Sequence, residues 1–219
     1  MHLIPTQEEV LALLRETGAL RDGHFEYSNG VHSGQHIETA LALRHYGNAK
    51  TLSVALSRCL RTDPELRVLL GQVSLVAATP SGLPVAYTLA EVLHPRQVYW
   101  VEKPHAGQPM RFYQYLQPSR GEPVILVDDI LRSGELLSEA RLLLHANGAH
   151  VLAIAVLIWQ PTPKTVDFAP LPVYSLARTA APAFSSGAAC ELCRRGIPLQ
   201  RIGRDWKAEE SIKARSAAS

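Results

Sequence analysis

Two adjacent acids, Asp128 and Asp129, directly follow an apolar run at Val124–Val127, and a short loop with Ser133 and Gly134 comes next. The run predicts a buried strand that ends at the acids, and the apolar spacing after the loop predicts a helix. In an open α/β sheet, ligands bind at the carboxyl ends of the strands, and the amino terminus of a helix attracts anions. The acids could therefore accept hydrogen bonds from sugar hydroxyls or help hold a hydrated cation, while the loop binds a phosphate. They could also simply cap the strand and the helix.

The elements around these acids must bring them to the edge of a sheet. From Val73 onward, short apolar runs alternate with helical stretches. Runs that are apolar on both faces are typical of buried parallel strands, so we expect an α/β fold with an open, mostly parallel sheet flanked by helices. The expected strands are Val73–Ala78, Val98–Val101, Val124–Val127 and Val151–Ile158, and the expected helices are Val85–Leu93 and Leu136–Ala146.

The first 60 residues show a different pattern. Thr6 and Glu9 have the spacing of a capping box, which predicts an amphipathic helix directly after Thr6. Asn29-Gly30 is a tight-turn pair within His24–Gln35, which predicts a short hairpin. Asn48 is the expected cap of a second helix.

These patterns divide the chain into three parts. Residues 1–60 form an amino-terminal segment of helix, hairpin and helix, residues 61–205 form the α/β core, and residues 206–219 form a flexible tail. Within the core, residues 103–121 contain Gly, Pro and basic residues without apolar periodicity. This composition predicts a long, mobile loop, called the hood loop below.

The composition excludes several classes of protein. Of the 219 residues, 47% are hydrophobic and 19% are charged, and no apolar stretch approaches the ~18 residues that would span a bilayer. The net charge of +2 is too small to favour nucleic acid or a membrane surface as a partner. The first residues lack the basic and apolar run of a secretory signal, and there are three cysteines, so we expect a cytoplasmic protein.

The segment Val124–Gly134 resembles the phosphoribosyl-diphosphate signature of the type I phosphoribosyltransferases. Both consist of a hydrophobic strand, two acids, two aliphatic residues and a small hydroxyl-bearing loop with Gly. The resemblance implies the type I phosphoribosyltransferase fold, with acids that contact the ribose hydroxyls and a loop that binds the 5-phosphate. The implied ribose 5-phosphate site comprises Asp128, Asp129, Arg132, Ser133, Gly134, Glu135 and Leu136.

Further segments resemble one branch of that family, the orotate phosphoribosyltransferases. Gly23–Ser33 resembles their amino-terminal hairpin beside the base pocket, and Thr79–Pro84 resembles the loop that holds the diphosphate. Tyr99–Lys103 and Met110–Phe112 resemble the strand and hood of these enzymes. Cys190–Leu199 resembles a carboxyl-terminal segment of several bacterial members.

The resemblance implies transfer of ribose 5-phosphate from phosphoribosyl diphosphate to orotate, which gives orotidine 5′-monophosphate and diphosphate. It implies Mg²⁺ carried by the diphosphate, with help from Asp128 and Asp129, and a homodimer with hoods that reach across the interface. Residues 1–60 would then form part of the hood and base pocket. The implied catalytic residues are Lys103, His105, Asp128 and Asp129, the diphosphate loop contains Thr79, Ser81 and Gly82, the base pocket contains Ser28, His36 and Gln160, and the hood contains Glu102 and Arg111.

Two departures from the family pattern leave alternatives open. The loop Arg132–Leu136 lacks a hydroxyl that the family usually has, and Glu135 adds a negative charge. Trp159-Gln160 stand where orotate enzymes usually have an Asp-Arg pair whose Arg meets the orotate carboxylate. The chain could therefore use another base, or it could be a non-catalytic regulatory protein of the same fold that binds phosphoribosyl diphosphate or a nucleotide.

Cys190 and Cys193 have the spacing of half a zinc site, although two further ligands would have to come from elsewhere in the chain. A thioredoxin-like redox role is disfavoured because the pair lies near the carboxyl end and not at a first strand-to-helix turn. His24, His32 and His36 could donate to a base or serve a structural role.

Overall fold

The computed structural model describes residues 4–105, 107–162 and 164–202, which form two compact units. Unit 1 takes its described residues from the ranges 1–18 and 39–180, and unit 2 takes them from 19–38 and 181–219. This grouping differs from the expected boundaries at residues 60 and 205, because the helices of the first 60 residues pack within unit 1 while the hairpin belongs to unit 2. The predicted tail, residues 206–219, lies outside the described residues.

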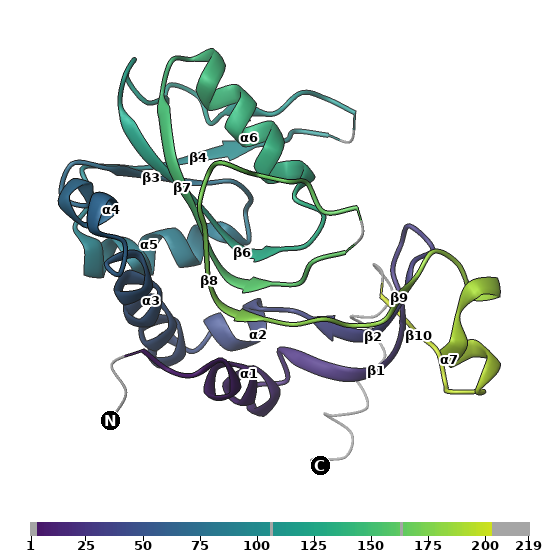
Figure 1. The fold of residues 1–219 in the computed structure, drawn as a ribbon. Helices are drawn as coiled ribbons and strands as arrows, with labels where there is room; N and C mark the ends of the chain where they lie inside the picture. Colours follow the sequence, from purple (N-terminus) through teal and green to yellow (C-terminus); the bar gives the residue numbers. More distant parts are fainter. Residues whose placement is uncertain (1–3, 106, 163, 203–219) are drawn as a thin grey trace, which may run out of the picture. The chain divides into compact units, whose positions relative to one another are not determined.

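Unit 1 is built on a six-stranded sheet in the order β5-β4-β3-β6-β7-β8 (Figure 1). Neighbouring strands are parallel except for the antiparallel pair of β4 and β5, which confirms the predicted open, mostly parallel sheet. The strands are β3 (Ser74–Ala77), β4 (Val98–Glu102), β5 (Arg111–Phe112), β6 (Pro123–Leu131), β7 (His150–Trp159) and β8 (Val173–Arg178).

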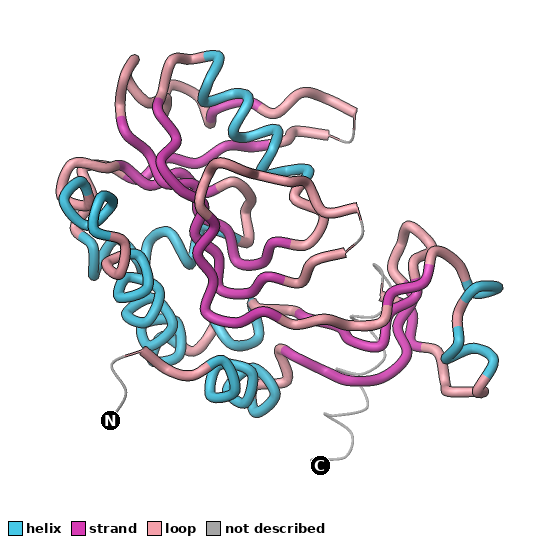
Figure 2. The backbone as a smooth tube through the Cα atoms, in the orientation of Figure 1, coloured by secondary structure: helices cyan, strands magenta, loops and turns pink. Residues whose placement is uncertain are grey.

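Helices connect two pairs of neighbouring strands in this sheet (Figure 2). The chain passes from β3 to β4 through α5 and, in the opposite direction along the sheet, from β6 to β7 through α6. Right-handed crossovers that run in opposite directions place their helices on opposite faces of a sheet, and Figure 1 shows α5 and α6 on opposite faces. The helices are α1 (Gln7–Glu16), α2 (Ala40–Leu43), α3 (Tyr46–Leu60), α4 (Pro64–Leu69), α5 (Gly82–Leu93) and α6 (Glu135–Ala146).

The helix starts test two of the sequence-based predictions. The capping box is confirmed: Thr6 accepts from the Glu9 N–H, and the Glu9 side chain accepts from the Thr6 N–H. The predicted cap at Asn48 is wrong, because α3 already begins at Tyr46. The His45 carbonyl accepts from the N–H groups of Asn48 and Ala49, so Asn48 lies inside the first turn. None of the described helices has the length and apolar character needed to cross a membrane.

Unit 2 contains a four-stranded sheet in the order β10-β1-β2-β9. The predicted hairpin is confirmed, with a turn in which the Gly30 N–H donates to the Tyr27 carbonyl at 2.8 Å. The carboxyl-terminal segment adds a short strand to each side of this hairpin. The elements are β1 (Leu20–Glu26), β2 (His32–Ile37), β9 (Ala183–Phe184), the single turn η1 (Gly187–Ala189), α7 (Glu191–Arg194) and β10 (Gln200–Arg201).

The central position of β6 in the core generates a stability prediction. Leu126 on β6 is fully buried, whereas Leu142 on α6 is 66% exposed. We expect Leu126→Ala to lower the free energy of unfolding by about 2–5 kcal/mol, because deleting buried methyl groups leaves a cavity. Leu142→Ala should change it by less than about 0.5 kcal/mol. Urea denaturation of both variants measures the difference, and equal losses would contradict a core built around β6.

Candidate active site

The two acids lie on β6 beyond the end of its neighbour β3. Pairing of β6 with β7 continues to Leu131, whereas pairing with β3 ends at Val127. The expectation that the strand ends at the acids is therefore wrong, because the parallel hydrogen bonds to β7 extend it. On the β3 side, Asp128 and Asp129 have no strand partner among the described residues, yet they are only 4% and 7% exposed.

This place is the point at which the strand order reverses. One crossover leaves β3 in one direction along the sheet, and the other leaves β6 in the opposite direction. In open α/β sheets the ligand crevice lies outside the carboxyl ends of strands at such a point. The acids therefore occupy the position at which this class of fold binds ligands.

Two threonine hydroxyls hold the acids. Thr79, in the loop after β3, donates to Asp128 Oδ1 at 2.5 Å, and Thr39, directly before α2, donates to Asp129 Oδ2. The Asp129 N–H also donates to Asp128 Oδ1, at 3.0 Å. Sequence reasoning identifies Thr79 as a site residue but misses Thr39, whose only signal is a hydroxyl at the cap position of a four-residue helix.

Burial makes it difficult for the pair to carry two negative charges. Removal from water, followed by the charge of Asp129, raises the pKa of Asp128 to about 8, while the hydrogen bond from Thr79 acts in the opposite direction. A ligand that brings hydroxyl donors or a cation would favour the charged form of both acids. The pair is therefore suited to a polyhydroxyl or cation-carrying ligand.

The loop after the acids forms the expected amino terminus of a helix. Gly134 directly precedes α6 and has a left-handed φ of +79°, and Glu135 and Leu136 are exposed in the first turn. The first N–H groups of a helix have no partners within the helix and attract anions. A Cβ on Gly134 would come within 2.9 Å of the Phe168 ring, so both the backbone angle and the space require glycine.

A segment that sequence reasoning misses holds this loop in place. Thr165 Oγ1 donates to the Arg132 carbonyl at 2.6 Å, and the Val166 N–H donates to the Ser133 carbonyl at 2.8 Å. Carbonyl oxygens would repel an anion, so bonding them to this segment favours binding of a phosphate by the loop.

The predicted diphosphate loop lies directly against the acid pair. The Gly82 N–H donates to Thr79 Oγ1 at 3.1 Å. A Cβ on Gly82 would lie 2.9 Å from Asp128 Oδ1 and 2.9 Å from the Val127 carbonyl oxygen, so only glycine allows this close approach. Ser81 is exposed at the first position before α5. The structure thus brings the acid pair and the predicted diphosphate loop together.

The hood residues are engaged with other partners. Lys103 Nζ lies 2.6 Å from Glu139 Oε1 of α6, and Arg111 lies 2.6 Å from Glu102 Oε1, its pairing partner across β4 and β5. His105 is exposed. Among the described residues, no hydrogen bond or ion pair joins these cations to the acid pair. Because exposed ion pairs are weak, Lys103 can leave Glu139 at little cost.

The predicted base-pocket residues divide between the two units. Gln160 belongs to unit 1, is 5% exposed, and donates its backbone N–H to the Leu131 carbonyl at 2.9 Å. Its side-chain Nε2 is buried and has no hydrogen-bond acceptor among the described residues. Ser28 and His36 belong to unit 2: Ser28 is exposed in the hairpin turn, and the buried His36 ring packs against Phe25 and Tyr27.

Solved structures with a similar fold are phosphoribosyltransferases. The crystal structure of orotate phosphoribosyltransferase from Aeropyrum pernix matches with a TM-score of 0.62 at 21% identity, covering 77% of this chain and 93% of that one. Adenine phosphoribosyltransferase from Thermoanaerobacter pseudethanolicus matches with a TM-score of 0.53 at 17% identity, covering 66% and 88%. These likenesses establish the type I phosphoribosyltransferase fold.

Sequence comparison identifies the branch. No protein-family model matches the chain. Orotate phosphoribosyltransferase of Acidithiobacillus ferrooxidans is 30% identical over 191 residues, which cover 87% of this chain and 93% of the relative. The enzyme of that name from Thermotoga maritima is 28% identical over 192 residues, covering 87% and 95%. With this identity over nearly the whole length of both chains, and with the acid pair and the loop at Gly134 at the expected edge of the sheet, the chain belongs to the orotate phosphoribosyltransferase family.

Proposed function

We propose that the chain transfers ribose 5-phosphate from phosphoribosyl diphosphate to orotate and releases orotidine 5′-monophosphate and diphosphate. The observation that carries this proposal is the meeting of the acid pair and the diphosphate loop at the switch point of the sheet, directly before the helix terminus at Gly134. The names of the relatives support orotate as the base.

The acid pair holds the ribose. Asp128 and Asp129 accept hydrogen bonds from its vicinal hydroxyls, while Thr79 and Thr39 keep the carboxyl groups in position. As the bond from the anomeric carbon to the diphosphate breaks, positive charge develops on the sugar. Carboxylates fixed beside the ring stabilise that charge without having to reorient.

The two anionic ends of the substrate bind on either side of the acids. The N–H groups of Ser133 to Leu136 bind the 5-phosphate, with the Arg132 side chain offsetting the negative charge of Glu135. Thr79, Ser81 and Gly82 bind the diphosphate. Lys103, His105 and Arg111 cover the diphosphate when the hood loop closes.

The acid pair also fits Mg²⁺ carried by the diphosphate. Two carboxylates and two threonine hydroxyls meet there, and oxygen atoms are the ligands that this hard cation prefers. When bound, Mg²⁺ neutralises charge on the departing diphosphate.

Gln160 binds the base in place of the Arg that the family usually has. Its buried Nε2 needs an acceptor, and a carboxylate or carbonyl oxygen of the base supplies one. A neutral amide binds a carboxylate less strongly than a guanidinium does, so this residue also favours a second candidate function, transfer to an uncharged base. The roles of Ser28 and His36, both in the hairpin, in binding the base stay predictions.

The resemblance also implies a cytoplasmic homodimer with hoods that reach across the interface. Tyr115 in the hood loop supports the interface, because its side chain is 96% exposed. A large aromatic side chain held in water suits a contact surface for a second subunit or for a closing hood.

The raised pKa of Asp128 predicts a pH-dependent stability. A carboxyl whose pKa is raised on folding adds stability that is fully present below its unfolded pKa of about 4. That stability is lost as the pH rises through its folded pKa of about 8. Between these values, the free energy of unfolding of the parent should fall relative to that of Asp128→Asn, by up to about 1.4 kcal/mol per pH unit. Denaturation at several pH values measures this, with the exposed Asp167→Asn as control. Parallel profiles for the parent and Asp128→Asn would contradict the burial of this charge.

We predict that Gly134→Ala weakens phosphate binding by the loop that precedes α6. The left-handed backbone costs Ala about 1–2 kcal/mol, and contact with Phe168 displaces the loop, so binding of ribose 5-phosphate should weaken by about tenfold or more. Gly121→Ala is a matched control, because Gly121 has a φ of +76° but no atom within 4 Å of the added Cβ. The Gly121→Ala variant should lose stability but keep the affinity of the parent for ribose 5-phosphate. Calorimetric titration compares the two, and equal affinities would place the phosphate elsewhere.

The choice of base is tested by diphosphate release from phosphoribosyl diphosphate with Mg²⁺ and orotate, uracil or adenine. We expect orotate to be preferred, and Gln160→Arg to raise kcat/KM for orotate by about ten- to a hundredfold, the equivalent of one charge-assisted hydrogen bond. Gln72→Arg, on the exposed turn before β3, adds the same charge and should change nothing.

Turnover of an uncharged base with no response to orotate would establish the second candidate. Binding of phosphoribosyl diphosphate without turnover of any base would favour the regulatory alternative.

A further inference from the structure

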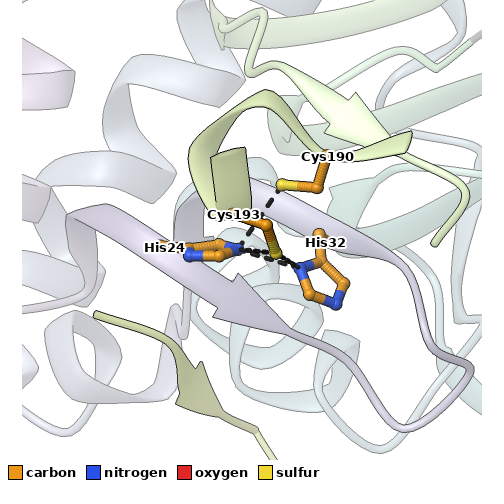
Figure 3. Close-up of side chains that lie close together, drawn as sticks. All are labelled: His24, His32, Cys190 and Cys193. Atoms are coloured by element: carbon orange, nitrogen blue, oxygen red, sulfur yellow. Dashed lines mark hydrogen bonds between the residues drawn. The ribbon is translucent and has the colours of Figure 1, made fainter. Parts of the chain in front are cut away.

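Four side chains of unit 2 with metal-binding atoms meet at one point (Figure 3). His24 comes from β1, His32 from β2, and Cys190 and Cys193 from the start and the body of α7. Their ligand atoms all lie within 4.8 Å of one another, and three of the four residues are buried. We propose that this cluster binds one zinc ion, which fastens the carboxyl-terminal segment to the hairpin. This site goes beyond the proposed transfer reaction and does not depend on which base is used.

Three distances between nitrogen and sulfur atoms of the cluster match those of a tetrahedral zinc site. With Zn–N of about 2.0–2.1 Å and Zn–S of about 2.3 Å, the nitrogen and sulfur ligands of one zinc ion lie about 3.5–3.6 Å apart. His24 Nε2 lies 3.5 Å from Cys190 Sγ and 3.6 Å from Cys193 Sγ, and His32 Nδ1 lies 3.5 Å from Cys193 Sγ. The two nitrogen atoms, at 2.8 Å, must separate slightly to hold the ion.

Neighbouring groups orient both imidazoles toward the centre of the cluster. His24 Nδ1 lies 2.9 Å from the Ile197 carbonyl, which can only accept, so Nδ1 carries the proton and Nε2 presents its lone pair to the cluster. On the other ring, His32 Nε2 lies 4.0 Å from the Glu26 carboxylate, while Nδ1 faces the cluster. A carbonyl bonded to the far nitrogen, as Ile197 is to His24, is a usual support of zinc-bound histidine.

Unit 2 has little else to hold it together. Its described residues bury only Ala19, Leu20, Phe25, Ile37 and Cys190 as apolar side chains. The carboxyl-terminal segment pairs with the hairpin over two residues at β9 and two at β10. A unit with so small a core usually needs a disulfide or a metal. A metal bound by two ligands from each segment would supply that connection.

The ligand set points to zinc in a structural role. Two thiolates and two imidazoles are the ligands of closed tetrahedral zinc sites, whereas Mg²⁺ and Ca²⁺ prefer oxygen. With four protein ligands, no position remains for water or substrate. Binding requires each thiol to lose its proton, and the ion replaces the two protons.

The test uses the full chain, purified without chelators and then supplied with Zn²⁺. Native mass spectrometry should find one zinc ion per chain, and removal by a chelator should lower the melting temperature. Replacement by Co²⁺ should give the visible absorption of a tetrahedral site together with thiolate charge-transfer bands. This spectrum needs no variant, so it is independent of folding defects in mutants.

Cys193→Ser should weaken zinc binding by more than about a hundredfold, since loss of even an outer partner of a ligand costs about ten- to a hundredfold. The matched control is Cys59→Ser, which removes the third cysteine, on α3 of unit 1, and should keep the zinc. Parent protein without stoichiometric zinc, a disulfide between Cys190 and Cys193, or cobalt bound without thiolate bands would each overturn the proposal.

Discussion

Two carboxyl groups side by side in a nearly dry part of the sheet are costly, because water cannot screen their repulsion. The groups around Asp128 and Asp129 reduce this repulsion. Thr79 and Thr39 each donate a hydrogen bond to one acid, and Asp128 keeps its proton well above the usual pH range of a carboxyl. Because β3 ends early, that side of the acids has no strand partner within the described part of the chain. In the proposed function, ribose hydroxyls and a cation carried by the substrate offset the negative charge of the pair.

Local patterns were sufficient to predict most of the unit that carries this site. The apolar runs that predicted the strands recur as β3, β4, β6 and β7, and the capping box at Thr6 is formed. The loop at Gly134 could be predicted because one short segment contains its strand, acids, glycine and helix start. In each case the residues that determine the structure are close together in sequence, so their spacing is enough.

Features that depend on distant partners could not be predicted in this way. The strand β6 continues past the acids because β7 pairs with it. The sequence of β6 alone does not predict where that pairing ends. Thr39 donates a hydrogen bond to Asp129, which lies 90 residues later in the sequence. Thr165 donates to the carbonyl of Arg132, which lies 33 residues earlier. The spacing of Cys190 and Cys193 suggested half a metal site, but only the fold identifies His24 and His32 as the residues beside them. Threonine and histidine are common, so their types alone do not indicate such roles.

Unit 2 is formed by two segments that lie far apart in the sequence, the hairpin and the carboxyl-terminal segment. This separation constrains the order in which the chain can fold. His24 and Cys190 are 166 residues apart, so the hairpin leaves the ribosome long before the segment that completes its sheet. Residues 39–180 lie between the two halves, and unit 1 can fold while the hairpin still has two unpaired edges. Exposed strand edges invite pairing with other chains. The nascent protein is therefore most vulnerable to aggregation in the interval between synthesis of the hairpin and arrival of the carboxyl-terminal segment, and an ion that joins the two segments would end that interval.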